Sequence, residues 1–282
     1  MPIKLIASDL DGTLIDHNNF IPTGNLTAIE DINKKNIDFA ICTGKTYSIT
    51  KDICDKCHAS YGIFGNGTQI INLKTGEEIY KNLLPIEDFN ACYDLAKKHN
   101  LHVHIYSDSE VISEELLYMD LRNYVLNGSK STSDLSFKTV NNIKDYVLNN
   151  KTPIFKLVIS STGDLSDLKD EILSSLNLNV TLIRKKDFYK DVIINKEYEY
   201  LDITPTNIGK GYALEYLSNF LNVNRSDVMA IGDNINDIDM IKTSGVSATL
   251  ADSYDEVKNI ASYITQNTSA NAGFAEAVYK FI

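Results

Sequence analysis

Two aspartates, Asp9 and Asp11, directly follow an apolar run over Ile3–Ala7. In an extended segment, side chains two residues apart point the same way, and Gly12 and Thr13 then end the strand in a tight turn. The first carboxylate can attack a phosphoryl group and form an aspartyl phosphate, while the second protonates the leaving oxygen and activates water. We therefore expect Asp9 to be a nucleophile and Asp11 a general acid–base. A surface Asp-Asp-Gly turn has the same composition, so later segments must support this interpretation.

The segment Thr43-Gly44-Lys45 follows a second apolar run, Ile37–Cys42. A hydroxyl and a free main-chain N–H at a strand-to-helix turn are good phosphate donors, which makes Thr43 and Gly44 candidate phosphate ligands. Thr43 could equally cap the helix that follows, and both roles can coexist.

Lys210 lies between Gly209 and Gly211 at the start of a predicted helix. The helix dipole disfavours a cation at this end, so the position conflicts with local electrostatics and indicates a functional role. The role we expect is to neutralise phosphoryl oxygens and to hold the carboxylate of Asp9.

Asp233 and Asp237 lie in Gly232-Asp233-Asn234-Ile235-Asn236-Asp237, directly after the apolar run Val228–Ile231. Mg2+ takes oxygen ligands in octahedral geometry, usually one or two carboxylates with substrate and water. Asp233 can complete such a site with the Asp9 side chain and the Asp11 carbonyl. Asp237, four residues on, is better placed to fix Lys210 or a magnesium-bound water. An EF-hand calcium loop is excluded because its spacing and closing glutamate are absent.

The motifs fall at the ends of short apolar runs that read as buried strands. These runs are Ile3–Ala7, Ile37–Cys42, Gly62–Phe64, Val228–Ile231 and Val246–Leu250, and helical patterns such as Thr23–Lys35 and Ile208–Leu221 separate several of them. Continuous apolar strands that alternate with helices predict a parallel α/β sheet covered on both faces. Ligands of such sheets gather beyond the carboxyl ends of the strands, which is where the polar motifs lie.

Between about Leu83 and Thr204 the pattern changes to helices mixed with alternating strands, which predicts a sheet with one face covered and the other exposed. The expected elements are Ile86–His99, Glu115–Leu126, Leu165–Leu176, His102–Tyr106, Phe155–Ser160, Val180–Arg184 and Tyr198–Ile203. We interpret residues 83–204 as an α/β domain inserted into a core of residues 1–82 and 205–282. The expected hinges are Asn82–Pro85 and Thr204–Thr206.

The inserted domain would exclude water by closing over the strand ends, and it would read the part of the substrate beyond the phosphate. Its polar and aromatic candidates for that reading are His102, His104, Tyr106, Arg184, Lys185 and Lys186. For each single position, the sequence favours an ordinary sheet-face residue over a substrate contact.

Composition narrows the class of protein. The net charge of −11 disfavours binding to nucleic acid, and no apolar run is long enough to span a membrane. The N-terminus runs straight into a strand without the layout of a signal peptide, so we expect a cytoplasmic protein. Cys54 and Cys57 have CxxC spacing, but no second pair completes a zinc site, and we expect reduced structural thiols.

Taken together, the motifs resemble the haloacid dehalogenase (HAD) superfamily, in particular its Cof-like phosphatases with a type C2B cap. The matching segments span the chain and are Asp9-Leu10-Asp11-Gly12-Thr13-Leu14, Thr43-Gly44-Lys45, Asn66-Gly67, Lys210-Gly211, Gly232-Asp233-Asn234-Ile235-Asn236-Asp237 and Ala272-Gly273-Phe274-Ala275. The resemblance implies a Rossmann-like parallel-sheet core with an inserted α/β cap. It also implies that Asp9 is the nucleophile and Asp11 the acid–base. Mg2+ would be bound by Asp9, Asp11 and Asp233, and phosphate by Thr43, Lys210 and Asn236, with Asp237 in a supporting position.

One residue departs from the family pattern, because Lys45 stands where the family usually has arginine. Lysine cannot make a planar bidentate contact, so a role in orienting cap or substrate does not carry over to it. The string Gly44-Lys45-Thr46 is not a nucleotide-binding P-loop, since no glycine-rich loop precedes it.

The sequence thus predicts a Mg2+-dependent phosphatase that acts on small, sugar-phosphate-like metabolites. Two alternatives remain open at this point. One is a phosphomutase of the phosphomannomutase type, which shares the cap type. The other is a sugar-phosphate sensor without turnover, although a sensor would not need the acid–base Asp11.

Overall fold

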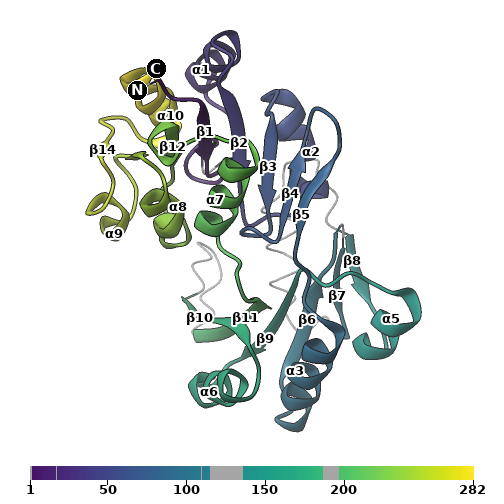
Figure 1. Cartoon of the computed structure of the whole chain (residues 1–282). Helices are drawn as coiled ribbons and strands as arrows, with labels where there is room; N and C mark the ends of the chain where they lie inside the picture. The colour runs from purple at the N-terminus through teal and green to yellow at the C-terminus, as the bar shows by residue number, and fades with distance from the viewer. Residues whose placement is uncertain (1, 17, 109, 115–135, 187–196) are drawn as a thin grey trace. The chain divides into compact units, whose positions relative to one another are not determined.

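The computed structural model describes the chain except for residues 1, 17, 109, 115–135 and 187–196. The chain forms two compact units, one of Met1–Lys81 with Ile208–Ile282 and the other of Asn82–Asn207. Each unit has its own sheet (Figure 1). Each also has its own hydrophobic core. The helix predicted over Glu115–Leu126 lies outside the described residues, and the role of the second unit as a cap stays a prediction.

The first unit is built on an eight-stranded sheet with the order β14-β13-β12-β1-β2-β3-β4-β5. Its strands are β1 Leu5–Ser8, β2 Asp38–Cys42, β3 Tyr61–Phe64, β4 Gln69–Asn72, β5 Glu78–Lys81, β12 Val228–Ile231, β13 Val246–Thr249 and β14 Tyr263–Ile264. The strands from β14 to β3 are parallel, whereas β4 and β5 are antiparallel additions at one edge. The predicted parallel α/β sheet is therefore confirmed, and the edge hairpin is a feature that the sequence analysis missed.

Helices cover both faces of this sheet. They are α1 Thr23–Lys34, α2 Tyr47–Lys56, α7 Lys210–Phe220, α8 Ile238–Thr243, α9 Asp255–Lys258 and α10 Gly273–Phe281. Neighbouring residues of β1 enter different cores: Ile6 packs in one cluster with α1 and α10, and Leu5 packs in another with α7 and α8. Because each face of the strand is buried, its sequence is continuously apolar instead of alternating.

The topology fixes where the polar loops lie. Since β1, β2, β3 and β12 are parallel neighbours, their carboxyl ends meet at one edge of the sheet. The residues that follow these strands are Asp9, Thr43, Gly65 and Gly232. Segments more than 200 residues apart in sequence are thereby brought next to one another.

The second unit has a six-stranded sheet with the order β10-β11-β9-β6-β7-β8, antiparallel except for the pair β7–β8. Its elements are α3 Ile86–Lys98, β6 His102–Tyr106, β7 Glu110–Ser113, β8 Ser136–Thr139, α5 Ile143–Asn150, β9 Lys156–Ser161, α6 Ser166–Ser175, β10 Leu178–Lys186 and β11 Glu197–Pro205. All three of these helices contribute to the core on one face of the sheet. Across both units, none of the described helices combines the length and the apolar character that crossing a membrane requires.

The other face of this second sheet differs from the expectation of an exposed surface. His102 and His104, on the face of β6 opposite the helices, are only 9% and 2% exposed, and their cross-strand neighbours Val158 and Ser160 are buried as well. The rings of His102, His104 and Tyr106 lie in a row along the strand, tilted relative to one another, with neighbouring centroids 5.6–5.7 Å apart. Histidine side chains have enough apolar surface to pack in this way. The alternation of polar and apolar residues therefore did not predict the exposure of this face correctly.

Burial of these histidines makes the stability of the protein depend on pH. Burial lowers the pKa of His104 to about 3 and that of His102 to about 4. Below the ordinary histidine pKa of 6.5, these side chains bind protons in the unfolded chain but not in the folded chain. The folded state therefore loses stability as the pH falls. We expect each such histidine to cost about 1.4 kcal/mol of unfolding free energy per pH unit below 6.5, until its folded pKa is reached.

The substitution His104→Gln isolates this effect, because glutamine does not titrate. Denaturant unfolding at about pH 8 and about pH 5.5 should show that the wild type loses more stability than the variant on acidification. The value at high pH serves as the reference, since both proteins are neutral at residue 104 there. Equal losses in the two proteins would mean that His104 accepts a proton without unfolding.

The CxxC pair does not have the properties of a redox site. Each of the four cysteines, all of which lie within the described residues, is a buried free thiol. Burial raises the pKa of Cys54 and of Cys57 to about 12, so both remain protonated thiols at neutral pH. Their place in the core on the α1 and α10 side of the sheet explains the spacing as packing of one helix face.

Candidate active site

Asp9 lies at the carboxyl end of β1, where its main-chain N–H donates to the oxygen of Ile231 at 2.8 Å. The residue is buried, with 6% of its surface exposed. Gly12 turns the loop with a φ of +84°, and a Cβ at this position would lie 2.7 Å from a carboxylate oxygen of Asp233. Only glycine satisfies both conditions. Thr13 then donates its hydroxyl to Asp233 Oδ1 at 2.6 Å, so the loop after β1 is folded tightly against the loop after β12.

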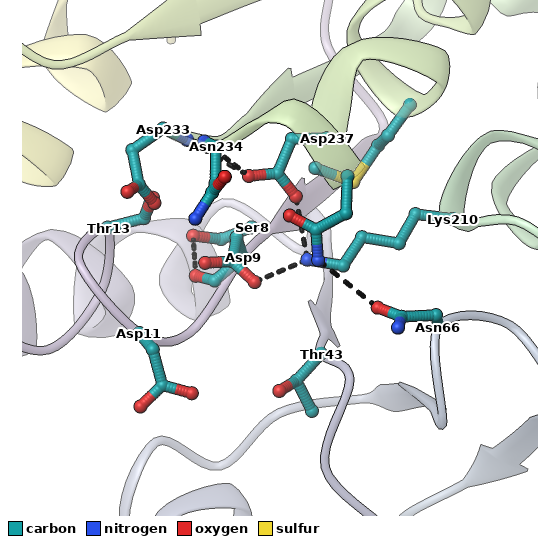
Figure 2. A network of polar contacts seen from close by, with 12 residues as sticks. Ser8, Asp9, Asp11, Thr13, Thr43, Asn66, Lys210, Asp233, Asn234 and Asp237 are labelled. Carbon is teal, nitrogen blue, oxygen red and sulfur yellow. Dashed lines mark hydrogen bonds and ion pairs between the residues drawn. The ribbon is translucent and has the colours of Figure 1, made fainter. Parts of the chain in front are cut away.

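Lys210 begins helix α7 and points into this junction, where it is 1% exposed. Its Nζ donates to Asp9 Oδ1 at 2.5 Å and to Asp237 Oδ1 at 2.6 Å. Figure 2 shows the ammonium held between these two carboxylates. The predicted contact between Lys210 and Asp9 is therefore present, and the unfavourable position at a helix N-terminus is offset by two buried carboxylates.

Asp237 is fully buried and uses both of its carboxylate oxygens within the protein. One oxygen accepts from Lys210, and the other accepts from the main-chain N–H groups of Asp233 and Asn234, both at 3.0 Å. Asp237 thus orients Lys210 and the loop that carries Asp233 together. The sequence left two roles open for Asp237, a contact with Lys210 or with a magnesium-bound water. The contact with Lys210 is present in the structure.

The electrostatics of this cluster are dominated by excess negative charge, since Asp9, Asp233 and Asp237 face the single ammonium of Lys210. Burial raises the pKa of Asp9 well above its ordinary value; Lys210 opposes this rise, and the other two carboxylates add to it. Burial also raises the pKa of Asp233 to about 6. Burial by itself would lower the pKa of Lys210, but the carboxylates of Asp9 and Asp237 raise it on balance. The cluster therefore favours an additional positive charge.

The donor set fits a hard divalent cation. Ligand oxygens of Asp9, Asp233 and Asp237 all lie within 4.8 Å of one another, and carboxylate oxygen is the ligand type that Mg2+ prefers. Because Asp237 is already engaged with Lys210 and two N–H groups, Asp9 and Asp233 are better placed to hold the ion. The Asp11 carboxylate points away from this cluster (Figure 2). A contribution of Asp11 to metal binding through its main-chain carbonyl stays a prediction.

A cavity of about 190 Å³ opens beside the cluster, lined by Asp9, Asp11, Thr43, Gly44, Lys45, Asn234 and Asn236. The cavity lining thus includes the predicted nucleophile and acid–base, and three of the four predicted phosphate contacts. The fourth, Lys210, does not line the cavity but contacts Asp9, which does. Helix α2 begins at Tyr47 with Thr46 at its N-cap, so the interpretation of Thr43 as that cap is wrong. The Thr43 hydroxyl instead accepts from the main-chain N–H of Lys45 at 3.2 Å and stabilises the turn itself.

Three site features were not among the predicted site residues. Asn234 lines the cavity, and Thr13 bonds Asp233 directly. Asn66, with a φ of +56°, accepts from Asn236 Nδ2 at 3.2 Å. The Asn-Gly pair after an apolar strand was the available signal for Asn66, because asparagine tolerates the left-handed conformation that such a turn requires.

The site thus consists of acidic loops at the carboxyl ends of a parallel α/β sheet and a buried pair of Asp9 with Lys210. The family described as haloacid dehalogenase-like hydrolase matches residues 6–278. The chain therefore belongs to this family.

Relatives and solved structures agree with that assignment. M6_Spy0533 of Streptococcus pyogenes serotype M6 is 27% identical over 290 residues, covering 100% of this chain and 99% of that protein. The 5-amino-6-(5-phospho-D-ribitylamino)uracil phosphatase YcsE of Bacillus subtilis is 27% identical over 281 residues, covering 99% and 96%. The crystal structure of a haloacid dehalogenase-like hydrolase from Bacteroides thetaiotaomicron is 26% identical, covers 99% of this chain and 100% of that chain, and has a TM-score of 0.81. The predicted family, fold class and enzyme class, a phosphoric monoester hydrolase, are confirmed.

Proposed function

We propose that the protein is a Mg2+-dependent phosphatase that hydrolyses small phosphomonoesters of the sugar-phosphate class through an aspartyl phosphate on Asp9. The observation that carries this proposal is the buried contact of 2.5 Å between Asp9 and Lys210 beside the cavity. An ammonium at this point holds one oxygen of the nucleophile and supplies positive charge where phosphoryl oxygens would develop negative charge. Ordinary structural ion pairs do not require such a costly burial of both partners.

In the first half-reaction, a carboxylate oxygen of Asp9 attacks phosphorus while the bond from phosphorus to the ester oxygen breaks. Asp11 donates its proton to that leaving oxygen, so the alcohol departs neutral. Thr43, Gly44 and Asn236 line the cavity and are the proposed contacts for the phosphoryl oxygens.

In the second half-reaction, Asp11 takes a proton from water while the water oxygen attacks phosphorus. The bond from phosphorus to Asp9 breaks, which releases inorganic phosphate and regenerates the carboxylate. One residue can serve as acid and then as base because the first step leaves it unprotonated.

The proposed ligands for Mg2+ are the carboxylates of Asp9 and Asp233, with the carbonyl of Asp11. When bound, the ion supplies neutralisation of negative charge on the nucleophile and the phosphoryl group. Burial, with a further contribution from neighbouring carboxylates, raises the pKa values of Asp9 and Asp233, and a bound cation would favour the ionised form of both.

The substrate class rests on a family resemblance and on one relative. The name of YcsE gives its substrate as a phosphorylated ribityl chain attached to a uracil ring, which is a sugar-alcohol phosphate. We propose a similar polyhydroxylated phosphomonoester here. We further propose that residues 82–207 act as a cap of type C2B. In support, Asn82 Nδ2 donates to the oxygen of Thr206 at 3.0 Å, which keeps the two connecting segments side by side, as a shared hinge requires.

The experiment is a phosphate-release screen over sugar phosphates, sugar-alcohol phosphates, nucleoside monophosphates and pyridoxal phosphate, with Mg2+ and with a chelator. We expect the highest kcat/KM among the first two groups and a loss of at least about 10²-fold on removal of the ion. A preference for nucleotides or pyridoxal phosphate would overturn the substrate class. Isomerised hexose phosphate without released phosphate would show that the protein is a mutase. Binding of a sugar phosphate without turnover would show that it is a sensor.

A further inference from the structure

Lys45, the residue that departs from the family pattern, makes one specific contact at the cavity. Its Nζ donates to Asp11 Oδ1 at 2.7 Å. Both residues line the cavity, and their side chains are 36% and 47% exposed, respectively. We propose that Lys45 is a positioning residue: it holds the side chain of Asp11 at the cavity wall, where that group, in its protonated form, gives its proton to the leaving oxygen and becomes a carboxylate. This inference rests on the proposed function and assigns a further residue to the same site.

The contact joins two main-chain segments that are each fixed independently. The N–H of Lys45 donates to the Thr43 hydroxyl at 3.2 Å, and its carbonyl accepts from Gly65 N–H at 2.9 Å. On the other side, Gly12 N–H donates to the carbonyl of Ile15 at 3.0 Å, which closes the turn that carries Asp11. The ammonium therefore extends from an anchored base to a carboxylate on an anchored loop. Such an arrangement restricts where the Asp11 side chain can lie.

Charge explains why Asp11 needs a partner of this kind. The neighbouring cluster of Asp9, Asp233 and Asp237 has more negative than positive charge, and Lys210 is already shared between two of its members. An unpaired Asp11 carboxylate would be repelled from the cluster and turn toward solvent. Partly exposed ion pairs contribute little to folding stability, so the protein gains little from this contact except the placement of Asp11.

The alternative role for Lys45 is a direct contact with the phosphate. The dependence of kcat/KM on the leaving group distinguishes this role from the positioning of Asp11. The value of kcat/KM reports the steps up to departure of the alcohol. An alkyl phosphate needs a proton on its leaving oxygen, whereas the p-nitrophenolate of p-nitrophenyl phosphate leaves without one. Loss of a residue that acts through the acid therefore affects mainly the alkyl ester. Loss of a phosphate ligand affects both esters equally.

The test measures kcat/KM for the best alkyl substrate of the screen and for p-nitrophenyl phosphate. We expect Lys45→Met to lower the alkyl value about tenfold, part of the roughly 10²–10⁴ that a positioned acid–base contributes, and the aryl value less than about twofold. Lys45→Arg should stay within about threefold of wild type for both esters, since arginine can also donate to Asp11. In an Asp11→Asn background, Lys45→Met should have no further effect. Lys51→Met, which removes an exposed lysine paired with Asp55 on α2, is the matched control and should change neither value.

Equal losses for both esters, or a further loss in the Asp11→Asn background, would overturn the inference in favour of a direct phosphate contact. Unchanged kinetics of Lys45→Met would also overturn it. In either case the proposed function stands, provided that the wild type hydrolyses both esters and Asp9→Asn hydrolyses neither. A wild type inactive toward both esters would sink the proposed function and this inference together.

Discussion

Replacing Asp9 by Asn should reduce phosphate release by at least about 10⁴-fold, because an amide cannot form the covalent phosphoenzyme. Steady-state phosphate release measures the loss. Acid-quenched wild type, examined by mass spectrometry during turnover, should carry one added phosphoryl group that the variant lacks. Ser8→Ala is a close control, since the Ser8 hydroxyl donates only to the main-chain carbonyl of Asp9 at 2.7 Å and leaves the carboxylate in place.

The same variant should be more stable than wild type when Mg2+ is absent. The folded-state pKa of Asp9 is raised above its unfolded value, so the folded protein favours the protonated form, and ionisation at neutral pH costs stability. Asparagine is neutral at every pH and removes that cost. We expect the unfolding temperature in chelator to rise, by about 2–4 °C for each kcal/mol regained. Persistent hydrolysis by this stable variant would mean that water attacks the ester directly, without a phosphoenzyme.

The centre of this site could be predicted from the sequence because its polar residues directly follow apolar runs, which marks the carboxyl ends of the strands. Asp9, Thr43 and Asp233 each follow a continuously apolar run, and parallel strands bring such positions to one edge. The exact register of strand pairing is not needed for this prediction, since each side chain lies directly after the end of its strand. This is why residues more than 200 positions apart could be assigned to one cluster.

Contacts between loops were not predictable in the same way. The approach of Gly12 to Asp233, the Asn66–Asn236 contact and the pair of Lys45 with Asp11 depend on turn conformations such as the left-handed Asn66. A single turn residue leaves no periodic pattern in the sequence. The β4–β5 hairpin was missed for a related reason. Each strand has only four residues, of which the two central ones are apolar and the outer ones polar, so neither shows an alternating pattern. The amide of Gln69 nevertheless donates to the carboxylate of Glu78 across the two strands.

Lys210→Met should be the most destabilising of the substitutions considered. It leaves the carboxylates of Asp9 and Asp237 buried without a counter-charge, and breaking a buried ion pair in this way costs about 3–5 kcal/mol. Denaturant unfolding in the presence of chelator measures the loss. The control is Lys4→Met, because Lys4 pairs with Asp227 at a similar distance of 2.8 Å but is 54% exposed. We expect that substitution to cost no more than about 1 kcal/mol.

A double substitution separates folding from catalysis at this lysine. Lys210→Met with Asp237→Asn removes one of the two uncompensated carboxylates, so much of the lost stability should return. Activity should not return, because the phosphoryl oxygens still lack the ammonium beside Asp9. If the double variant regained activity together with stability, Lys210 would serve only to hold the fold. If the single variant were as stable as Lys4→Met, the buried carboxylates would have to be held as neutral acids, and the charge imbalance that favours Mg2+ at this site would not exist.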